Sequence, residues 1–319
     1  MNVKIETLPF SPRHPHLKLD VVRPQGPEPP QGWPVIIWLH GGGWRLQSRT
    51  ARPDFPKHFA AEGFAMVSID YRLAPAHPHP AQVHDLRQAI RFLRLHHVDL
   101  ILDPERIGLW GSSAGGHIAA MTALKGDLKY TDAEAVPTDY RDIPTHVSCV
   151  MEGYGPARIE QLLPAYMGAE TPQDMPVTTP EQDLLGGAAT SPESYDHQLK
   201  WAAAASPVHQ DAAQAPPFLI MHGTDDCMVP PGQSIALHTH LAQAGRQSTL
   251  VLIEGFGHGF LNPGEVAELG PNVRLDNGRL EREPRTDFRI AQSPRNRFEL
   301  RNLAADHEMI LRFFALYLR

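Results

Sequence analysis

Short runs rich in Val, Ile and Leu recur along the chain and predict buried strands. The runs are continuous rather than alternating, which is typical of a parallel sheet covered by helices on both faces. They occupy residues 35–40, 65–71, 106–111, 146–152, 217–222 and 249–254. A further run at 17–23 predicts an antiparallel edge strand that leads into the sheet.

Helical patterns separate these runs. The clearest spans residues 80–97, where Val, Leu and Ile recur at the spacing of one helix face. Similar patterns cover residues 115–124, 231–244 and 303–318. The alternation of strands and helices predicts the α/β class, with a mostly parallel, doubly wound sheet and helices on both faces.

We predict a single domain over residues 1–319, because α/β folds of this length often carry insertions. Residues 156–205 contain loose, Pro- and Gly-rich helical pieces, which we expect to form a small cap. Residues 262–302 form a second insertion before the last helix. Within it, residues 273–281 alternate around Asn277-Gly278, which predicts a β-hairpin. A solvated, charged loop is the alternative.

Composition excludes several classes of function. The chain is 42% hydrophobic and 20% charged, with a net charge of −7, so it lacks the basic character of nucleic-acid-binding proteins. No apolar stretch approaches the ~20 residues of a membrane span, and the first residues lack the apolar core of a signal peptide. Cys149 and Cys227 are too few for a disulfide framework. We therefore expect reduced cysteines and a cytoplasmic location.

The run Gly111-Ser112-Ser113-Ala114-Gly115 lies between a predicted strand and a predicted helix. A G-x-S-x-G sequence in this context predicts a nucleophile elbow, a sharp turn that exposes the central serine. Glycines two residues before and after Ser113 let the strand and the helix crowd together. We predict that Ser113 is a catalytic nucleophile.

A serine nucleophile needs a base, and the base needs an orienting acid. In folds of this kind the partners follow in the order Ser, acid, His, at the ends of later strands. His258 comes after the predicted strand at 249–254, flanked by glycines, and is the predicted base. Asp225 and Asp226 follow the strand at 217–222, and both are candidates for the acid.

Attack on an acyl carbon requires N–H donors for the negative oxygen that develops. His40-Gly41-Gly42-Gly43-Trp44 directly follows the first predicted strand and fits an HGGG-type oxyanion loop. We predict that the oxyanion hole is formed by the amides of Gly42, Gly43 and Ala114. The alternative, a phosphate loop, lacks the G-x-x-x-x-G-K-[ST] pattern.

Other residues receive weaker predictions. Trp44 is a candidate for substrate binding, with packing against the glycine loop as the alternative. Tyr154 follows a predicted strand and is a second candidate, although a packing role is the safer interpretation. The histidine pairs of the chain lack metal-ligand spacing, so we predict no metal site.

Four motifs in order resemble the α/β-hydrolase superfamily, and within it the HGGG-type carboxylesterases. They are His40–Trp44, residues 70–75 (Asp-Tyr-Arg-Leu-Ala-Pro), residues 111–116 and residues 222–226 (His-Gly-Thr-Asp-Asp). The resemblance is to the BD-FAE-like and hormone-sensitive-lipase-like esterases, and it favours Asp226, the fifth residue of His-Gly-x-x-Asp. It implies hydrolysis of short-chain esters through an acyl-enzyme, without metal or organic cofactor. The chain lacks a long N-terminal helical cap, which favours the BD-FAE-like group.

The predicted function is therefore that of a serine carboxylesterase acting on a small-molecule ester. An amide hydrolase, either an arylformamidase or a small peptidase, is the alternative, because both reactions share the tetrahedral intermediate. A ligand-binding protein on a hydrolase fold is an alternative from another class. We expect no nucleic-acid or membrane partner, and homo-oligomerisation through the late insertion stays open. Asp70 and Arg72 are expected to form an ion pair or hydrogen-bond network that supports the oxyanion loop, with Asp85 in a similar role.

Overall fold

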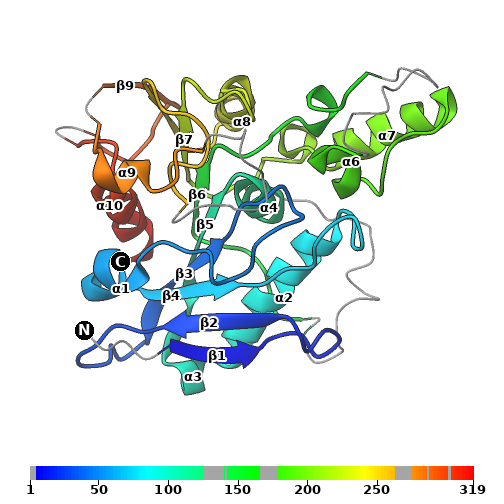
Figure 1. Cartoon of the computed structure of the whole chain (residues 1–319). Helices are drawn as coiled ribbons and strands as arrows, with labels where there is room; N and C mark the ends of the chain where they lie inside the picture. The colour runs from blue at the N-terminus through cyan, green and yellow to red at the C-terminus, as the bar shows by residue number, and fades with distance from the viewer. Residues whose placement is uncertain are drawn as a thin grey trace.

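A mixed β-sheet forms the centre of the molecule. The computed structural model describes residues 5–124, 140, 142–165, 178–262, 275–285, 287–300 and 303–319. In these residues the sheet has nine strands in the order β1-β2-β4-β3-β5-β6-β7-β8-β9 (Figure 1). The strands are β1 Ile5–Pro9, β2 Lys18–Val22, β3 Trp33–Leu39, β4 Ala65–Ile69, β5 Leu102–Ser112, β6 Cys149–Gly153, β7 Phe218–Gly223, β8 Ser248–Ile253 and β9 Phe288–Gln292.

The neighbouring strands in the middle of the sheet are parallel, and antiparallel strands flank them at both edges. β4, β3, β5, β6, β7 and β8 pair in parallel. β1 and β2 continue the sheet antiparallel at one edge, and β9 does so at the other. The carboxyl ends of the parallel strands therefore meet at one edge of the sheet, where α/β proteins bind their ligands.

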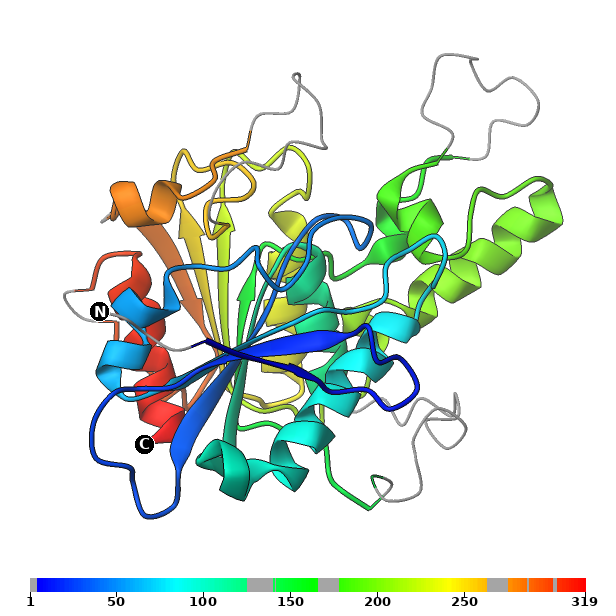
Figure 2. The same ribbon diagram turned by 60° about the horizontal axis from the view of Figure 1, so that its bottom comes forward.

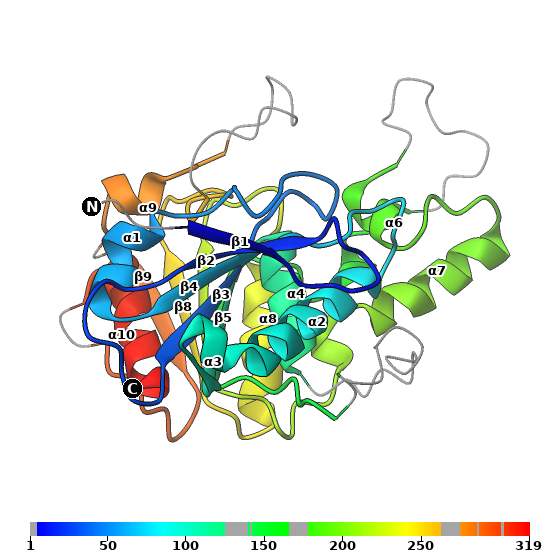
Figure 3. The ribbon, with the colours of Figure 1, turned by 90° about the horizontal axis from the view of Figure 1, so that it is seen from below.

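Helices cover both faces of the sheet, as Figure 3 shows. The residues of α2, α4 and α8 join the core on one face, and those of α1 and α10 join the core on the other. In Figure 2 the red helix α10 lies beside the blue α1. The helices are α1 Phe55–His58, α2 Ala81–Leu95, α3 His97–Leu100, α4 Ala114–Ala123, α6 Pro180–Leu184, α7 Pro192–Ala204, α8 Gly232–Gln243, α9 Arg279–Arg282 and α10 His307–Leu318.

Helix α10 illustrates how the sequence specifies these elements. Asp306 caps its first turn by accepting the amide of Met309 at 2.9 Å. Ile310, Phe313 and Phe314 are buried and recur at helix spacing, so one stripe faces the sheet. Burial of side chains of this size contributes about 1.5–3 kcal/mol each, which fixes the helix against β5 and β6.

The central strands and the main helices confirm the sequence expectations, whereas the outermost strands do not follow from them. β1 and β9 were not predicted because edge strands carry few of the continuous apolar residues that mark buried ones. None of the helices in the described ranges has the length and apolar character needed to cross a membrane.

The predicted hairpin at 273–281 is wrong where the structure describes it. Residues 273 and 274 lie outside the described residues, and Arg279–Arg282 is the helix α9. Gly278, with φ +65°, is its N-cap, and its amide donates to the carbonyl of Asn262. The Arg279 guanidinium lies 4.3 Å from the ring centre of Phe256. Gly278 and Arg279 thus contact residues outside the segment, and the described part of it shows no cross-strand pairing of a hairpin.

The segment expected to form a cap contains α6 and α7. Both helices begin with a capping box, at Thr179 and Ser191 respectively, and a proline in the first turn. They project on the side of the molecule that carries α2 and α4 (Figures 1 and 3). The start of α6 reaches the oxyanion loop, because Pro180 lies within 3.4 Å of the position that a Cβ on Gly43 would occupy.

Candidate active site

Ser113 occupies a strained turn between β5 and α4. Its backbone has φ 54° and ψ −122°, which is unusual for a residue with a side chain. Gly115 allows the turn to pack against β3, since a Cβ there would lie 2.2 Å from the carbonyl oxygen of Leu39. The local sequence thus forms the predicted elbow and directs the serine side chain away from the sheet.

The Ser113 hydroxyl faces an imidazole from the loop after β8. His258 Nε2 lies 2.8 Å from Ser113 Oγ, and His258 Nδ1 lies 2.6 Å from Asp226 Oδ2. Asp226 follows β7, so three strand ends at one edge of the sheet supply the three side chains. Because a carboxylate only accepts, Nδ1 carries the proton and Nε2 is left to accept one from the serine.

The two candidate acids have different environments. Asp225 is exposed, whereas Asp226 is buried and contacts His258. Asp226 Oδ1 accepts the amides of Met228 and Val229 at 3.0 and 2.9 Å. Burial disfavours the Asp226 carboxylate, but hydrogen bonds from His222 and His258 outweigh it and hold the Asp226 pKa well below its ordinary value. Asp226 is therefore ionised at neutral pH, as an orienting acid must be.

The glycine loop after β3 presents backbone amides beside Ser113. Gly42 has φ +102°, and a Cβ there would lie 2.6 Å from the carbonyl oxygen of Leu46, so the turn requires glycine. In the described part of the chain, the amides of Gly42 and Gly43 donate no hydrogen bond. The Ala114 amide is at the first position of α4, where a helix leaves its N–H groups unpaired. All three amides are thus available to an oxyanion.

The Tyr71 side chain supports this loop by packing against His40, its first residue. The Tyr71 hydroxyl donates to the carbonyl of His40 at 2.8 Å, and the two rings stack at 4.2 Å. Burial lowers the His40 pKa to about 4, so His40 is neutral at neutral pH and its role is structural. Residues 70–75 form one of the four motifs, but no sequence pattern indicates that Tyr71 binds the loop.

The ion pairs near this loop differ from those expected. Asp70 and Arg72 were expected to share one ion pair or network, but Asp70 pairs with Arg49 at 3.0 Å. Arg72 pairs with Asp85 at 2.8 Å instead. Because Asp85 also accepts the Arg72 amide, this pair ties the loop after β4 to α2.

A cavity of about 280 Å³ opens in front of the triad. Ser113, His258 and the three predicted oxyanion residues line one side of it. Apolar side chains line much of the remainder: Pro156, Pro180, Met228, Val229 and Leu275. The lining therefore combines a few polar groups at the nucleophile with an apolar surround, which is typical of a small-molecule site.

Of the two predicted substrate-binding residues, one lines this cavity. Trp44 does so, although it is almost fully buried and its Nε1 donates to His117 Nδ1 at 3.1 Å. Tyr154 is fully buried, and its ring packs 4.7 Å from that of His258. Its hydroxyl accepts the amide of Leu261 at 3.0 Å. Tyr154 does not line the cavity, which contradicts the prediction that it touches substrate and favours the packing role.

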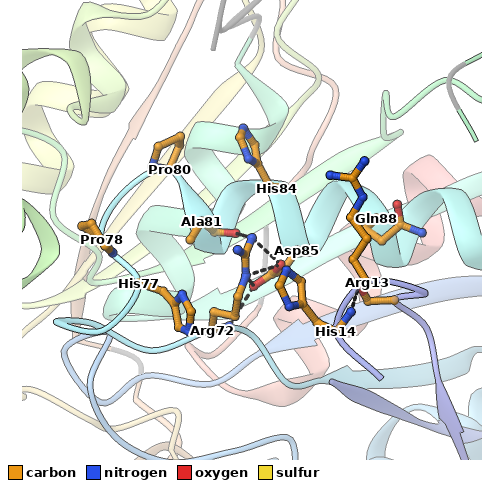
Figure 4. A pocket seen from close by; sticks show the side chains of 11 residues that line it. Arg13, His14, Arg72, His77, Pro78, Pro80, Ala81, His84, Asp85 and Gln88 are labelled. Atoms are coloured by element: carbon orange, nitrogen blue, oxygen red, sulfur yellow. Dashed lines mark hydrogen bonds and ion pairs between the residues drawn. The ribbon is translucent and has the colours of Figure 1, made fainter. Parts of the chain in front are cut away.

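A second cavity, of about 360 Å³, lies beside the Arg72–Asp85 pair (Figure 4). Figure 4 shows His14, His77 and His84 around it, drawn from three different segments. It shares no lining residue with the cavity at Ser113. Ser113 and His258 therefore face only the first of these two cavities.

Comparisons with known proteins agree with this geometry. A family model described as BD-FAE matches residues 19–241, more than half of the 319 residues. "Esterase LipC" of Mycobacterium tuberculosis is 30% identical over 71% of this chain and 53% of its own length. The chain spans between 31% and 53% of the length of the first four curated relatives.

Solved structures similar to this chain are esterases as well. The Thermogutta terrifontis esterase Est2 with butyrate bound has a TM-score of 0.64 and is 26% identical, over 84% of this chain and 88% of its own. A truncated carbohydrate esterase from gut microbiota has a TM-score of 0.59 and is 28% identical, over 75% and 83%. The nine-stranded sheet, the serine at the end of β5 and the matched family model together show that this chain is an α/β-hydrolase of the BD-FAE family.

Proposed function

We propose that this chain is a serine carboxylesterase that cleaves small carboxylic esters through an acyl-enzyme. The observation that carries the proposal is the hydrogen-bonded series Ser113–His258–Asp226 at the wall of an apolar cavity. The esterase names of LipC and Est2 support the same chemistry.

Each side chain then has a defined task. His258 Nε2 takes the Ser113 proton while Oγ bonds to the ester carbonyl carbon, and Asp226 stabilises the imidazolium that forms. The amides of Gly42, Gly43 and Ala114 hold the carbonyl oxygen as it becomes negative. His258 returns the proton to the departing alcohol, and water repeats the sequence to release the acid. Each oxyanion donor in such a site contributes about 10²–10³-fold in kcat.

The dimensions of the cavity support a short acyl group. A volume of about 280 Å³ is at the small end of ligand sites, which begin at roughly 300 Å³. Thr179, Pro180 and Glu181 at the start of α6 line it beside the glycine loop, so we propose that residues 156–205 act as a cap on a single domain. On this proposal, acyl length is limited by α6 and by Met228 and Val229.

Two further expectations accompany the proposal. A cytoplasmic location is consistent with Cys149 and Cys227, which are both free. Homo-oligomerisation through the late insertion stays a prediction, which light scattering of the full-length protein would test, because residues 262–302 include the sheet strand β9 and cannot simply be removed.

Labelling with a fluorophosphonate, followed by intact mass and peptide mapping, tests the nucleophile. One adduct on Ser113 is expected, and Ser113→Ala should lose it while retaining the thermal unfolding of the wild type. The variant should also lower kcat on p-nitrophenyl acetate by on the order of 10⁶-fold. An adduct that persists in Ser113→Ala would contradict the assignment.

A series of p-nitrophenyl esters tests the substrate class. Turnover should fall steeply as the acyl chain lengthens, because α6 limits the cavity. Labelling of Ser113 without turnover of any ester in the series would favour the amide-hydrolase alternative. The absence of labelling would favour the ligand-binding alternative.

A further inference from the structure

A second histidine lies behind the acid of the triad. His222, at the end of β7, is fully buried, and its Nε2 is 3.2 Å from Asp226 Oδ2 and 2.8 Å from the carbonyl oxygen of Val229. Carboxylate and carbonyl oxygens only accept, so His222 Nε2 must carry a proton. Asp226 Oδ2 therefore receives two imidazole donors, one from His258 and one from His222.

The other nitrogen of this ring meets a buried serine from α8. His222 Nδ1 lies 2.7 Å from Ser234 Oγ. With the proton on Nε2, the Nδ1 of a neutral imidazole accepts, so the Ser234 hydroxyl donates to it. Ser234 itself is fully buried and has no access to solvent. The serine therefore selects the His222 tautomer that can donate to Asp226.

A buried carboxyl lies near the serine. Glu152, on β6, is almost fully buried, and its Oε1 accepts the amide of Gly155. Burial raises the Glu152 pKa to about 8. The hydrogen-bonded series that fixes the His222 ring therefore runs from Ser234 through His222 to Asp226.

The aromatic neighbour of His222 carries no charge. The ring of Tyr154 lies edge-on to His222 at 6.3 Å and to His258 at 4.7 Å. Burial raises the Tyr154 pKa far above its ordinary value, so the phenol is neutral. Among the described residues, the titratable groups that face His222 are thus Asp226, Tyr154 and, through Ser234, Glu152.

We infer that His222 is a positioning residue, held by Ser234 in the tautomer that anchors the Asp226 carboxylate for His258. The inference rests on the proposed role of Ser113, His258 and Asp226 in ester hydrolysis. A neutral His222 holds Asp226 Oδ2 in line with His258 Nδ1, so the negative charge of Asp226 stabilises the His258 imidazolium alone. A charged His222 would compete with that imidazolium for Asp226 Oδ2.

Ser234→Ala tests this role. The change leaves His222 Nδ1 as a buried acceptor without a donor, so the tautomer with the proton on Nε2 loses its preference. A ring that moves its proton to Nδ1 can no longer donate to Asp226 Oδ2, and the carboxylate is held less well against His258. We expect the rate of Ser113 phosphonylation by a fluorophosphonate to fall about tenfold.

The protein offers a matched control in Ser248→Ala. Ser248 on β8 makes the same kind of buried contact, 2.9 Å to His238 Nδ1, and neither residue lines the cavity at Ser113. This variant should phosphonylate within about twofold of the wild type. Thermal unfolding of both variants shows whether they fold equally well.

Ring 15N spectra of the full-length protein give a readout that needs no substrate. The wild type should show His222 protonated on Nε2 alone at neutral pH, and Ser234→Ala should add a population of the ring with its proton on Nδ1. A wild-type His222 protonated on Nδ1 alone would overturn the inference, as would a Ser234→Ala that behaves like Ser248→Ala. A wild type that never reacts with the fluorophosphonate would refute the proposed function, while the ring spectra would still decide the tautomer.

Discussion

Replacing Glu152 by glutamine should stabilise the fold increasingly as the pH rises. The folded chain keeps a proton on this buried carboxyl, whose pKa burial raises from 4.5 to about 8. The unfolded chain releases that proton near pH 4.5, so the unfolding free energy of the wild type falls as pH rises from about 4.5 to about 8. Glutamine has no such proton, so Glu152→Gln lacks this loss.

The size of the effect follows from the difference between the two pKa values. About 3.5 pH units at about 1.36 kcal/mol each give an upper limit of roughly 5 kcal/mol. Relaxation of the folded state around an ionised carboxylate reduces this, so we expect about 3–5 kcal/mol. For a protein with a typical stability of about 5–15 kcal/mol, the difference is large enough to measure.

Urea unfolding at about pH 5 and about pH 8.5 measures it, with tryptophan fluorescence as the signal. The quantity compared is the unfolding free energy of Glu152→Gln minus that of the wild type, so that the other titrating groups cancel. An exposed residue, Glu28, gives the control, and Glu28→Gln should show the same difference at both pH values. A pH-independent difference for Glu152→Gln as well would refute the reasoning, because it would mean that the carboxyl is already ionised in the folded state.

Three other substitutions probe the site. Asp226→Asn should lower kcat by on the order of 10⁴-fold with little change in unfolding temperature, because the amide stabilises the wrong histidine tautomer; steady-state kinetics check it. Tyr71→Phe leaves the His40 carbonyl without its donor and should cost about 1–3 kcal/mol in urea unfolding and lower kcat with KM unchanged; an unaltered kcat would show that the loop holds its shape alone. Gly115→Ala places a Cβ 2.2 Å from the Leu39 carbonyl oxygen, so little folded protein should be recovered, as circular dichroism would report.

The sequence was sufficient where chemistry and local geometry coincide. Ser113 could be predicted because glycines, a buried strand and a helix pattern surround it in one short segment. His258 could be predicted because it follows the last buried strand. Neither acid could be chosen from spacing alone, since Asp225 and Asp226 are adjacent; the resemblance favoured Asp226, and in the structure it alone contacts His258.

What could not be predicted depends on contacts between distant segments. Asn277-Gly278 has the sequence of a hairpin turn, but Asn262 accepts the Gly278 amide, Phe256 packs against Arg279, and a helix forms instead. Tyr154 follows a strand at the active-site edge, yet its side chain turns beneath His258. From the sequence, His222 could be assigned only to the His-Gly-x-x-Asp motif. Its contact with Asp226 depends on how the loop after β7 folds back, which no local pattern encodes.

Because the triad is drawn from the ends of β5, β7 and β8, it can also report on how the chain folds. Ser113 and His258 are 145 residues apart in sequence and meet only when these strands have paired in register. Contacts of such long range form late, since the loops that they close cost entropy before the contacts repay it. A fluorophosphonate added during refolding would therefore mark only the molecules whose sheet is complete. The rate at which the labelled fraction grows would then measure the last stage of assembly.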